Sequence, residues 1–439
     1  MNSAESARAH TRVRLPADQR RAHLLDESAR LFMERGYAGV GIDEIGAAVG
    51  ISGPAVYRHV AGKEQLLAEI ALNWLDEITT RIQVVRDGDP SGAQIDPEEL
   101  HRRILQTGID FCLTTIPHLT VVLRYVHPGI EHEAFAPRAL ADSPSPEETV
   151  QTGLDEARSF AVQRFALMRD TLGHSLRHFN PSMPQESMSV YTRAAAALVL
   201  GAASSDRDIS HSARSNALVM AVMRLFRTPL IEGEMSIIKN DAPGWSRASR
   251  REQILRTAVR MFRERGYGGV SMADIAGEVG ITASASYRHF VSKDDLLATA
   301  MLRTANRFVS GLGEALLSAH NADQAMTNML HRYVMDTLAD RDMALVTGRE
   351  RFHLAEEPRA ELHRLERVVF DEWSLALAAL RPEYSPAERE LLIAAAHRVI
   401  VEMAYAWGNA SADNLENMLF RMAQSILGVG QPVSAGEAA

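Results

Sequence analysis

The sequence predicts an all-α protein made of two tandem units, each a small three-helix domain followed by a larger helical domain. Residues 21–68 and 251–298 align without a gap and share 22 identities in 48 positions. Apolar residues recur at helical spacing within both segments, and no alternating run long enough for a sheet follows them. A period of 230 residues is too long for a solenoid, so we infer a duplicated domain.

The bulk composition is that of an ordinary globular protein. The chain has 439 residues, of which 46% are hydrophobic and 23% charged. Its single cysteine, Cys112, excludes an intrachain disulfide or a four-thiolate metal site and favours a reducing cytoplasm. The longest nearly apolar run, residues 194–203, is half of what spans a bilayer, and the N-terminus lacks the apolar core of a secretory signal. We therefore expect a soluble cytoplasmic protein with no membrane partner.

The net charge is −9, but two segments of the chain are basic. Residues 1–24 carry five Arg against one Glu and one Asp, a local +3, and residues 245–265 carry seven Arg against two Glu, a local +5. Both segments lie next to a repeat. A basic patch on an acidic body is typical of a DNA-facing surface, and the alternative is a solvated helix face.

The first repeat predicts four successive helices. The first helix ends at the C-cap signal Arg35-Gly36, and its apolar face is formed by Leu24, Leu25, Ser28, Leu31 and Phe32. The second spans residues 43–49 and stops at Gly50. The fourth begins near Lys63 and continues as an apolar stripe to Ile78.

The third helix is placed by its N-cap. Ser52 in the first copy and Thr282 in the second precede it, and Pro54 lies in its first turn, where a missing N–H does no harm. In the second copy, Ser271 and Asp274 have the spacing of a capping box. Two short helices joined by a tight turn at residues 50–52 form a helix-turn-helix, whose second helix fits the DNA major groove.

At these residues both copies closely resemble the DNA-binding domain of the TetR family of bacterial transcriptional regulators. The matching features are the FxERGYxGV run, the VGI turn, AVYRH in the first copy and ASYRH in the second, and a lysine shortly before Leu-Leu. The resemblance covers about 48 residues in each copy. The segments between resemble the family's helical ligand-binding and dimerisation domains in length, composition and placement only.

The resemblance implies DNA-contacting residues in both recognition helices and at the start of the following helix. They are Ser52, Gly53, Pro54, Ala55, Tyr57, Arg58, His59, Lys63, Thr282, Ala283, Ser284, Ala285, Ser286, Tyr287, Arg288, His289 and Lys293. An arginine can bond a guanine edge twice or clamp a phosphate. The two tyrosines can donate to phosphate, or alternatively brace the small domain. Because SGPAV is apolar where TASAS carries hydroxyls, we expect the copies to recognise unlike half-sites.

The resemblance further implies a small effector inside a helical domain, and no cofactor. Candidate ligand residues are Phe111, Leu123, Arg124, His127, Arg349, Phe352, His353 and Trp373, each of which has the alternative of a core or surface position. The segment from His127 to Glu133 lacks metal-ligand helical spacing and contains Pro-Gly, so no metal site is expected.

Family members act as two-fold dimers through their last two helices. The equivalents here are residues 185–204 with 211–226 and residues 386–407 with 414–427, which we expect to pack as a pseudo-symmetric four-helix bundle within one chain. The alternative is a homodimer with four heads.

These patterns divide the chain into seven parts. They are a basic arm (1–19), the first helix-turn-helix domain (20–67), the first helical domain (68–232), a linker (233–248), the second helix-turn-helix domain (249–297), the second helical domain (298–427) and a disordered tail (428–439). We expect a ligand-responsive regulator, a repressor rather than an activator, that binds operator DNA. A scaffold that has lost DNA binding and an enzyme with vestigial heads are the alternatives, although no Walker, Gly-x-Ser-x-Gly or GxGxxG motif is present.

Overall fold

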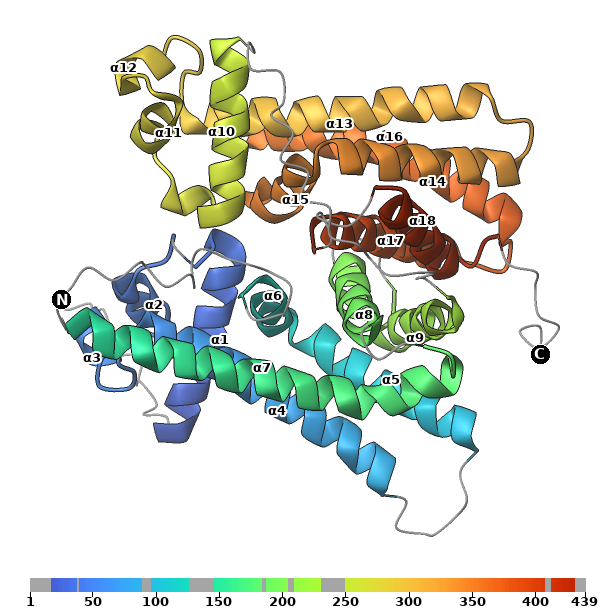
Figure 1. Ribbon diagram of the computed structural model, residues 1–439, viewed down its shortest axis with the longest axis horizontal. Coiled ribbons are helices and arrows are strands. Elements are labelled where there is room, and N and C mark those ends of the chain that lie inside the picture. The colour runs from blue at the N-terminus through green and yellow to red at the C-terminus, as the bar shows by residue number, and fades with distance from the viewer. Residues whose placement is uncertain are drawn as a thin grey trace, which may run out of the picture.

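The computed structural model describes residues 17–37, 39–88, 96–125, 146–183, 187–203, 209–229, 249–406 and 412–430. Within these ranges the chain is helical and contains no strand, which confirms the all-α prediction. Figure 1 shows two units, one above the other, with their first three helices at one side of the molecule and their last two helices facing each other at its centre.

Each helix of the first unit has a counterpart in the second, in the same order. The first unit consists of α1 (Ala17–Arg35), α2 (Ile42–Ala48), α3 (Gly53–Val56), α4 (Lys63–Asp87), α5 (Pro97–Thr114), α6 (Ile116–Tyr125), α7 (Pro146–Phe179), α8 (Met188–Ala203) and α9 (His211–Arg227). The second consists of α10 (Arg250–Arg265), α11 (Met272–Val279), α12 (Ala283–Ser286), α13 (Lys293–Leu317), α14 (Ala322–Ala339), α15 (Arg341–Glu350), α16 (Glu356–Leu380), α17 (Pro386–Ala406) and α18 (Ala412–Leu427), with short 3-10 turns η3 (Tyr267–Gly269) and η4 (Arg351–His353).

The duplication therefore extends far beyond the similar sequence. Helices α4 and α13 both have 25 residues, α5 and α14 both 18, and α6 and α15 both 10. Sequence identity reveals the repeat only in the small domains, since a helical layer can keep its geometry while its apolar side chains are exchanged for others of similar volume.

The small domains, here called head 1 (α1–α3 with the start of α4) and head 2 (α10–α12 with the start of α13), fold as predicted. Phe32, Ile45 and Val56 are each fully buried in head 1. The predicted N-caps Ser52 and Thr282 precede α3 and α12, and the predicted capping box at Ser271 opens α11.

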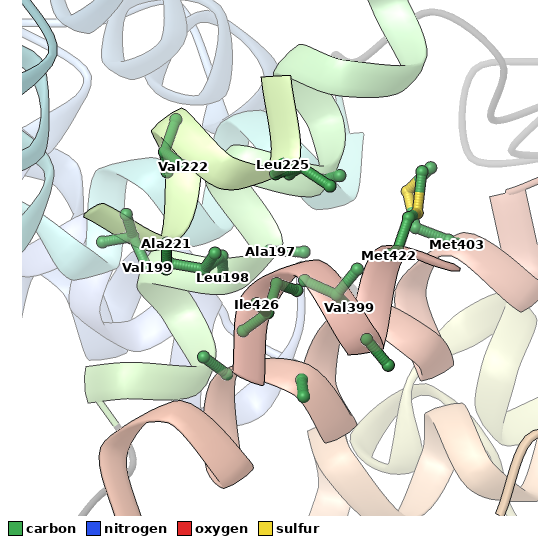
Figure 2. Close-up of a cluster of buried hydrophobic side chains, with 14 of the residues drawn as sticks. Ala197, Leu198, Val199, Ala221, Val222, Leu225, Val399, Met403, Met422 and Ile426 are labelled. Carbon is green, nitrogen blue, oxygen red and sulfur yellow. The ribbon is translucent and has the colours of Figure 1, made fainter. Parts of the chain in front are cut away.

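The two units meet through the predicted helices. Helix α8 packs along α17, α9 packs on α18 and α17, and one apolar core runs through both units (Figure 2). Arg224 of α9 donates to the carbonyls of Ser425 and Ile426, both at 2.9 Å. At Gly201 the helices approach so closely that a Cβ would lie 2.6 Å from the carbonyl oxygen of Ala394. The expected four-helix packing within one chain is confirmed for the described residues.

Several predicted boundaries differ from the structure. Helix α4 runs unbroken through the proposed boundary at residues 67 and 68, so each head shares a helix with its body. Val429 is 6% exposed and Arg381 donates to the carbonyl of Gly428, so the first residues of the predicted tail pack on the fold. His127 and the linker 233–248 lie outside the described residues.

Candidate nucleic-acid interface

The turn before each recognition helix is built in the same way in both heads. Gly50 and Gly280 adopt φ values of 72° and 73°, which a side chain would disfavour. The amide of Ile51 donates to the carbonyl of Gly46 at 2.9 Å, and that of Ile281 donates to Ala276 at the same distance. Both recognition helices are therefore set at the same angle to the helix before them.

The predicted contact residues at the middle of each recognition segment lie on the surface. Tyr57 is 58% exposed and Tyr287 52%, and the following Arg58 and Arg288 are exposed too. A bracing tyrosine would be largely covered, so this exposure favours a contact role over bracing. The exposed residues at the start of the helices differ in chemistry: Ser52 and Pro54 in head 1, Thr282 and Ser284 in head 2.

Two predicted contact residues require correction. Ser286 is fully buried, occupies the place that Val56 occupies in head 1, and donates its hydroxyl to the carbonyl of Ala283 at 2.7 Å. Gly53 is also buried, and a side chain there would collide with the carboxylate of Asp43. Both residues support the domain from inside and present no side chain to a ligand. Ala55, Ala283 and Ala285 are half-buried beside them.

Lys63 and Lys293 are bound to their own domains. The Lys63 ammonium donates to the carbonyls of Tyr37 at 2.7 Å and Val40 at 3.0 Å, and Lys293 donates to Tyr267 and Val270, both at 2.8 Å. Burial lowers the pKa of both lysines. Because an ammonium has three donors, one remains for the phosphate contact that the sequence predicts.

Two arginines that the prediction missed hold the ends of the recognition segments. Arg21 donates to the carbonyl of His59 at 2.6 Å and pairs with Glu69, and Arg251 donates to the carbonyl of His289. The signal was present, because Arg21 and Arg251 are the first identity of the repeat alignment. The histidines themselves are half-buried.

The basic segment predicted at residues 245–265 offers less positive charge than its sequence suggests, because several of its arginines form ion pairs. Arg256 pairs with Glu252 at 2.9 Å, Arg260 with Glu278 at 2.7 Å and Arg263 with Asp342 at 2.9 Å. Near the recognition helix, Arg250 and Arg251 are exposed and form no ion pair among the described residues. Near the recognition segment, the unpaired positive charge thus lies at the start of α10, where Arg251 contacts the carbonyl of His289.

The two heads touch each other through the loops that follow α1 and α10. A Cβ placed on Gly268 would lie 2.9 Å from the Cα of Gly39, and one on Gly36 would lie 3.8 Å from the Cα of Gly266. Glycine is required for this close approach. Figure 1 shows α3 and α12 at the same side of the molecule, on either side of the head–head contact.

The candidate ligand residues do not form one site. Trp373 is buried against His397, with ring centroids 4.6 Å apart, while Phe352 is 59% exposed and faces solvent, so it lines no cavity. Phe111 lies against Trp74, Leu123 belongs to the core of the first unit, and His353 stacks on Tyr267 of head 2. Arg124 and Arg349 are the exception: both are buried and both face Glu402.

The described residues contain no group of three His, Cys, Asp or Glu side chains that could hold a metal ion. None of the helices in the described part is long and apolar enough to span a bilayer. Cys112 is buried, and burial raises the pKa of its thiol to about 12.

Comparison with known proteins identifies the heads. The model of the "Bacterial regulatory proteins, tetR family" matches residues 24–70 and again residues 254–300. The chain is 34% identical over 70 residues to the HTH-type transcriptional activator FasR of Mycolicibacterium smegmatis, which is 16% of this chain and 32% of FasR. It is 40% identical over 50 residues to the HTH-type transcriptional repressor KstR2 of the same organism, which is 11% of this chain and 24% of KstR2.

The chain thus spans about a third or less of the length of these two relatives. Among solved structures, a TetR-family regulator from Bordetella parapertussis has 21% identity and a TM-score of 0.37, and the alignment covers 41% of this chain and 95% of that one.

Proposed function

The chain carries two TetR-family helix-turn-helix domains in tandem, and from this premise we propose that it regulates transcription by binding double-stranded operator DNA with both heads. The observation that carries the proposal is the pairing of the two units within one chain. Two recognition helices on one side of the molecule, joined through a shared core, match the way that two-headed regulators engage half-sites about 34–36 Å apart.

A fused pair of heads changes the concentration dependence of binding. When two heads belong to one chain, the second head binds at a high effective concentration and needs no second molecule. The buried contact between α8 and α17 keeps the units together. We propose that the monomer is the DNA-binding species, with a four-headed homodimer as the alternative that a mass measurement at nanomolar concentration distinguishes.

The two heads recognise unlike half-sites. Pro54 offers an apolar surface to a thymine methyl group, whereas the hydroxyl of Ser284 at the equivalent exposed position can donate to or accept from a base edge. The preferred operator is therefore an imperfect palindrome. Ser286 contributes nothing to this difference, because it is buried.

We further propose that binding represses transcription and that a small effector releases the DNA. The relatives include a protein named a repressor and one named an activator. Repression needs only that the bound protein occupies a promoter, whereas activation needs an added contact with the transcription machinery. An effector acts only if it prefers one arrangement of the heads over another.

The proposal is tested by selecting bound DNA from a random pool with the full-length chain, followed by gel-shift titration at several salt concentrations. We expect an imperfect palindrome and an affinity that falls steeply with salt, since arginine contacts to phosphate release counterions. Failure to bind any selected sequence at low ionic strength would rule out the proposal. A perfect palindrome would remove only the claim of unlike half-sites.

A further inference from the structure

Three arginines pair with one buried carboxylate where the two units meet, and a fourth arginine lies near it. Arg193 of α8, Arg349 of α15 and Arg398 of α17 pair with Glu402 at 3.5, 3.2 and 2.7 Å. Arg124 of α6 also acts on the charge of Glu402. The exposed fractions are 1% for Arg193 and 2% for Glu402. We call these five residues the arginine cluster.

The four arginines come from two pairs of corresponding helices. Arg124 and Arg349 are each the ninth residue of a ten-residue helix, and Arg193 and Arg398 lie in α8 and α17. Four residues after Arg398 stands Glu402, while four residues after Arg193 stands Ala197. Arg193 therefore lacks the carboxylate that Arg398 has one turn farther along its own helix.

The charge in the cluster is therefore unbalanced. Burial lowers the pKa of both Arg193 and Arg398 to about 10. Glu350 is the other buried carboxyl nearby and interacts with Arg124 and Arg349, so four arginines share two carboxyls, Glu402 and Glu350. Buried ions are normally paired, because an unpaired one loses its hydration without compensation.

The arginines of the cluster also have more hydrogen-bond donors than the surrounding residues have acceptors for them. The Nε and Nη1 atoms of Arg193 are buried without a hydrogen-bond acceptor and its Nη2 atom comes no closer than 3.5 Å to Glu402, while the Nε atom of each of the other three arginines is also buried without an acceptor. A guanidinium offers five N–H donors in a planar fork that fits the oxygens of a carboxylate or phosphate. The missing element is thus an anionic acceptor for the Arg193 guanidinium.

We propose that the arginine cluster binds an oxyanion, the carboxylate or phosphate group of a small molecule, at the junction of the two units. The oxyanion accepts from Arg193, whose Nε and Nη1 atoms have no acceptor in the protein. Its binding requires the side chains around Arg193 to move apart, because their N–H groups are fully enclosed in the present arrangement.

The position of the cluster suits communication with the heads. Arg124 donates from Nη1 to the carbonyl of Met33 in α1, at 2.9 Å. Next to Arg349, Glu350 pairs at 3.5 Å with His353, whose ring stacks on Tyr267 of head 2 at 4.6 Å. An anion that draws Arg124 or Arg349 inward would change how each head is held. This consequence for DNA rests on the proposed function, whereas the anion site itself does not.

The test uses the full-length chain without DNA and measures its melting temperature and titration calorimetry with sodium acetate and, separately, inorganic phosphate. We expect at least one of the two to bind saturably and to raise the melting temperature by about 2–5 °C. Arg193→Met should lower the affinity at least about tenfold, since a charge-assisted bond is lost. The two arms distinguish a carboxylate from a phosphate ligand.

Two further variants keep the test decisive if Arg193→Met folds poorly. Arg193→Lys keeps a positive charge but removes the planar fork of N–H donors, so it should weaken the anion response while preserving the charge of the site. Glu402→Gln removes one of the two carboxyls and should strengthen the response. Equal anion responses in the wild type and in all three variants would overturn the proposal, because general salt effects act on all four alike. Loss of DNA binding alone would leave the anion site standing.

Discussion

The two units have the same helices in the same order, yet they contribute different chemistry to the contact between them. The second unit supplies Glu402 and a buried histidine, His397, from α17, whereas α8 of the first unit contains no acidic residue and no histidine. In a dimer of identical chains one sequence must serve both sides of the interface. Fusion removes this constraint, so each side can specialise while the fold of both is kept.

The heads also differ in how they are attached. The core of head 2 continues into α15 and α16 through Met343, Val346 and Leu362, whereas among the described residues that of head 1 receives Val121 from its own body, with Tyr125 at its edge. Head 1 is held by polar contacts instead, among them the bond from the amide of Tyr37 to the hydroxyl of Tyr125 at 3.0 Å. Among the described residues, the two heads are therefore held to their bodies by different kinds of contact.

The largest effect is expected from breaking the contact between the units. In Gly201→Leu the added side chain meets the backbone of α17, since even a Cβ would lie 2.6 Å from Ala394 O and 2.7 Å from Ala395 Cα. We expect a loss of about 3 kcal/mol or more in the free energy of unfolding, measured by urea titration. Gly313→Ala, at an exposed helical glycine with open space around it, is the control and should be neutral or slightly stabilising. Equal stability of the two variants would contradict the close packing.

The next largest effect is a loss of stability in acid, which we expect to arise from His397 in the second unit. His397 is buried among Tyr333, Phe370 and Trp373, and burial lowers its pKa to about 3. In the unfolded chain the histidine side chain has a pKa near 6.5, so below that pH it binds a proton that the buried side chain of the folded protein does not bind. The stabilisation is fully present above pH 6.5 and is lost as pH falls toward 3, by about 1.4 kcal/mol per pH unit.

Urea unfolding at pH 7.5 and pH 5.0 measures this loss. His397→Gln should show a smaller difference between the two pH values than the wild type, because the other histidines titrate in both proteins. A Thr192→Ser variant in the first unit, where nothing titrates, should keep the wild-type difference. The same pH dependence in the glutamine variant would show that His397 is not the group responsible.

The sequence predicted the heads well because their chemistry is local. A capping box at Ser271 and glycines at the turns specify short helices through bonds within a few residues. The prediction erred at Ser286, because a hydroxyl in a recognition segment looks exposed until the fold shows it in the place of Val56. It overestimated the basic patch for a similar reason, since Arg263 meets Asp342 from a distant helix.

The arginine cluster was beyond sequence reasoning as a whole. Arg124 and Arg349 were proposed as separate ligand residues of two helical domains, and nothing local indicates that they face the same carboxylate. Their meeting depends on the packing of α8 along α17, which apolar side chains of no particular pattern produce. Long-range convergence of this kind follows from tertiary contacts that a single sequence does not encode at fixed spacing.

A smaller effect is expected from removing one arginine from either head, which tests whether both heads contact DNA. Arg58→Ala and Arg288→Ala should each weaken binding to the selected operator by about 1–3 kcal/mol and reduce its salt dependence, measured by gel shift. Because the half-sites are expected to be unlike, the two losses should differ in size and in the bases affected. An Arg164→Ala variant, on a body helix, controls for net charge. Unchanged affinity after altering one head would mean that the other head binds alone.

The smallest change in stability is expected from removing the N-cap side chains of the two recognition helices. The hydroxyl of Thr282 accepts from the amide of Ala285 at 3.3 Å, whereas the side chain of Ser52 forms no cap bond, and Pro54 already lacks one of the amides that would need an acceptor. Thr282→Ala should therefore cost about 1 kcal/mol and speed amide hydrogen exchange at the start of α12, while Ser52→Ala should leave head 1 nearly unchanged. If both variants lost stability equally, the caps would be equivalent, and the difference between the heads would be confined to their exposed side chains.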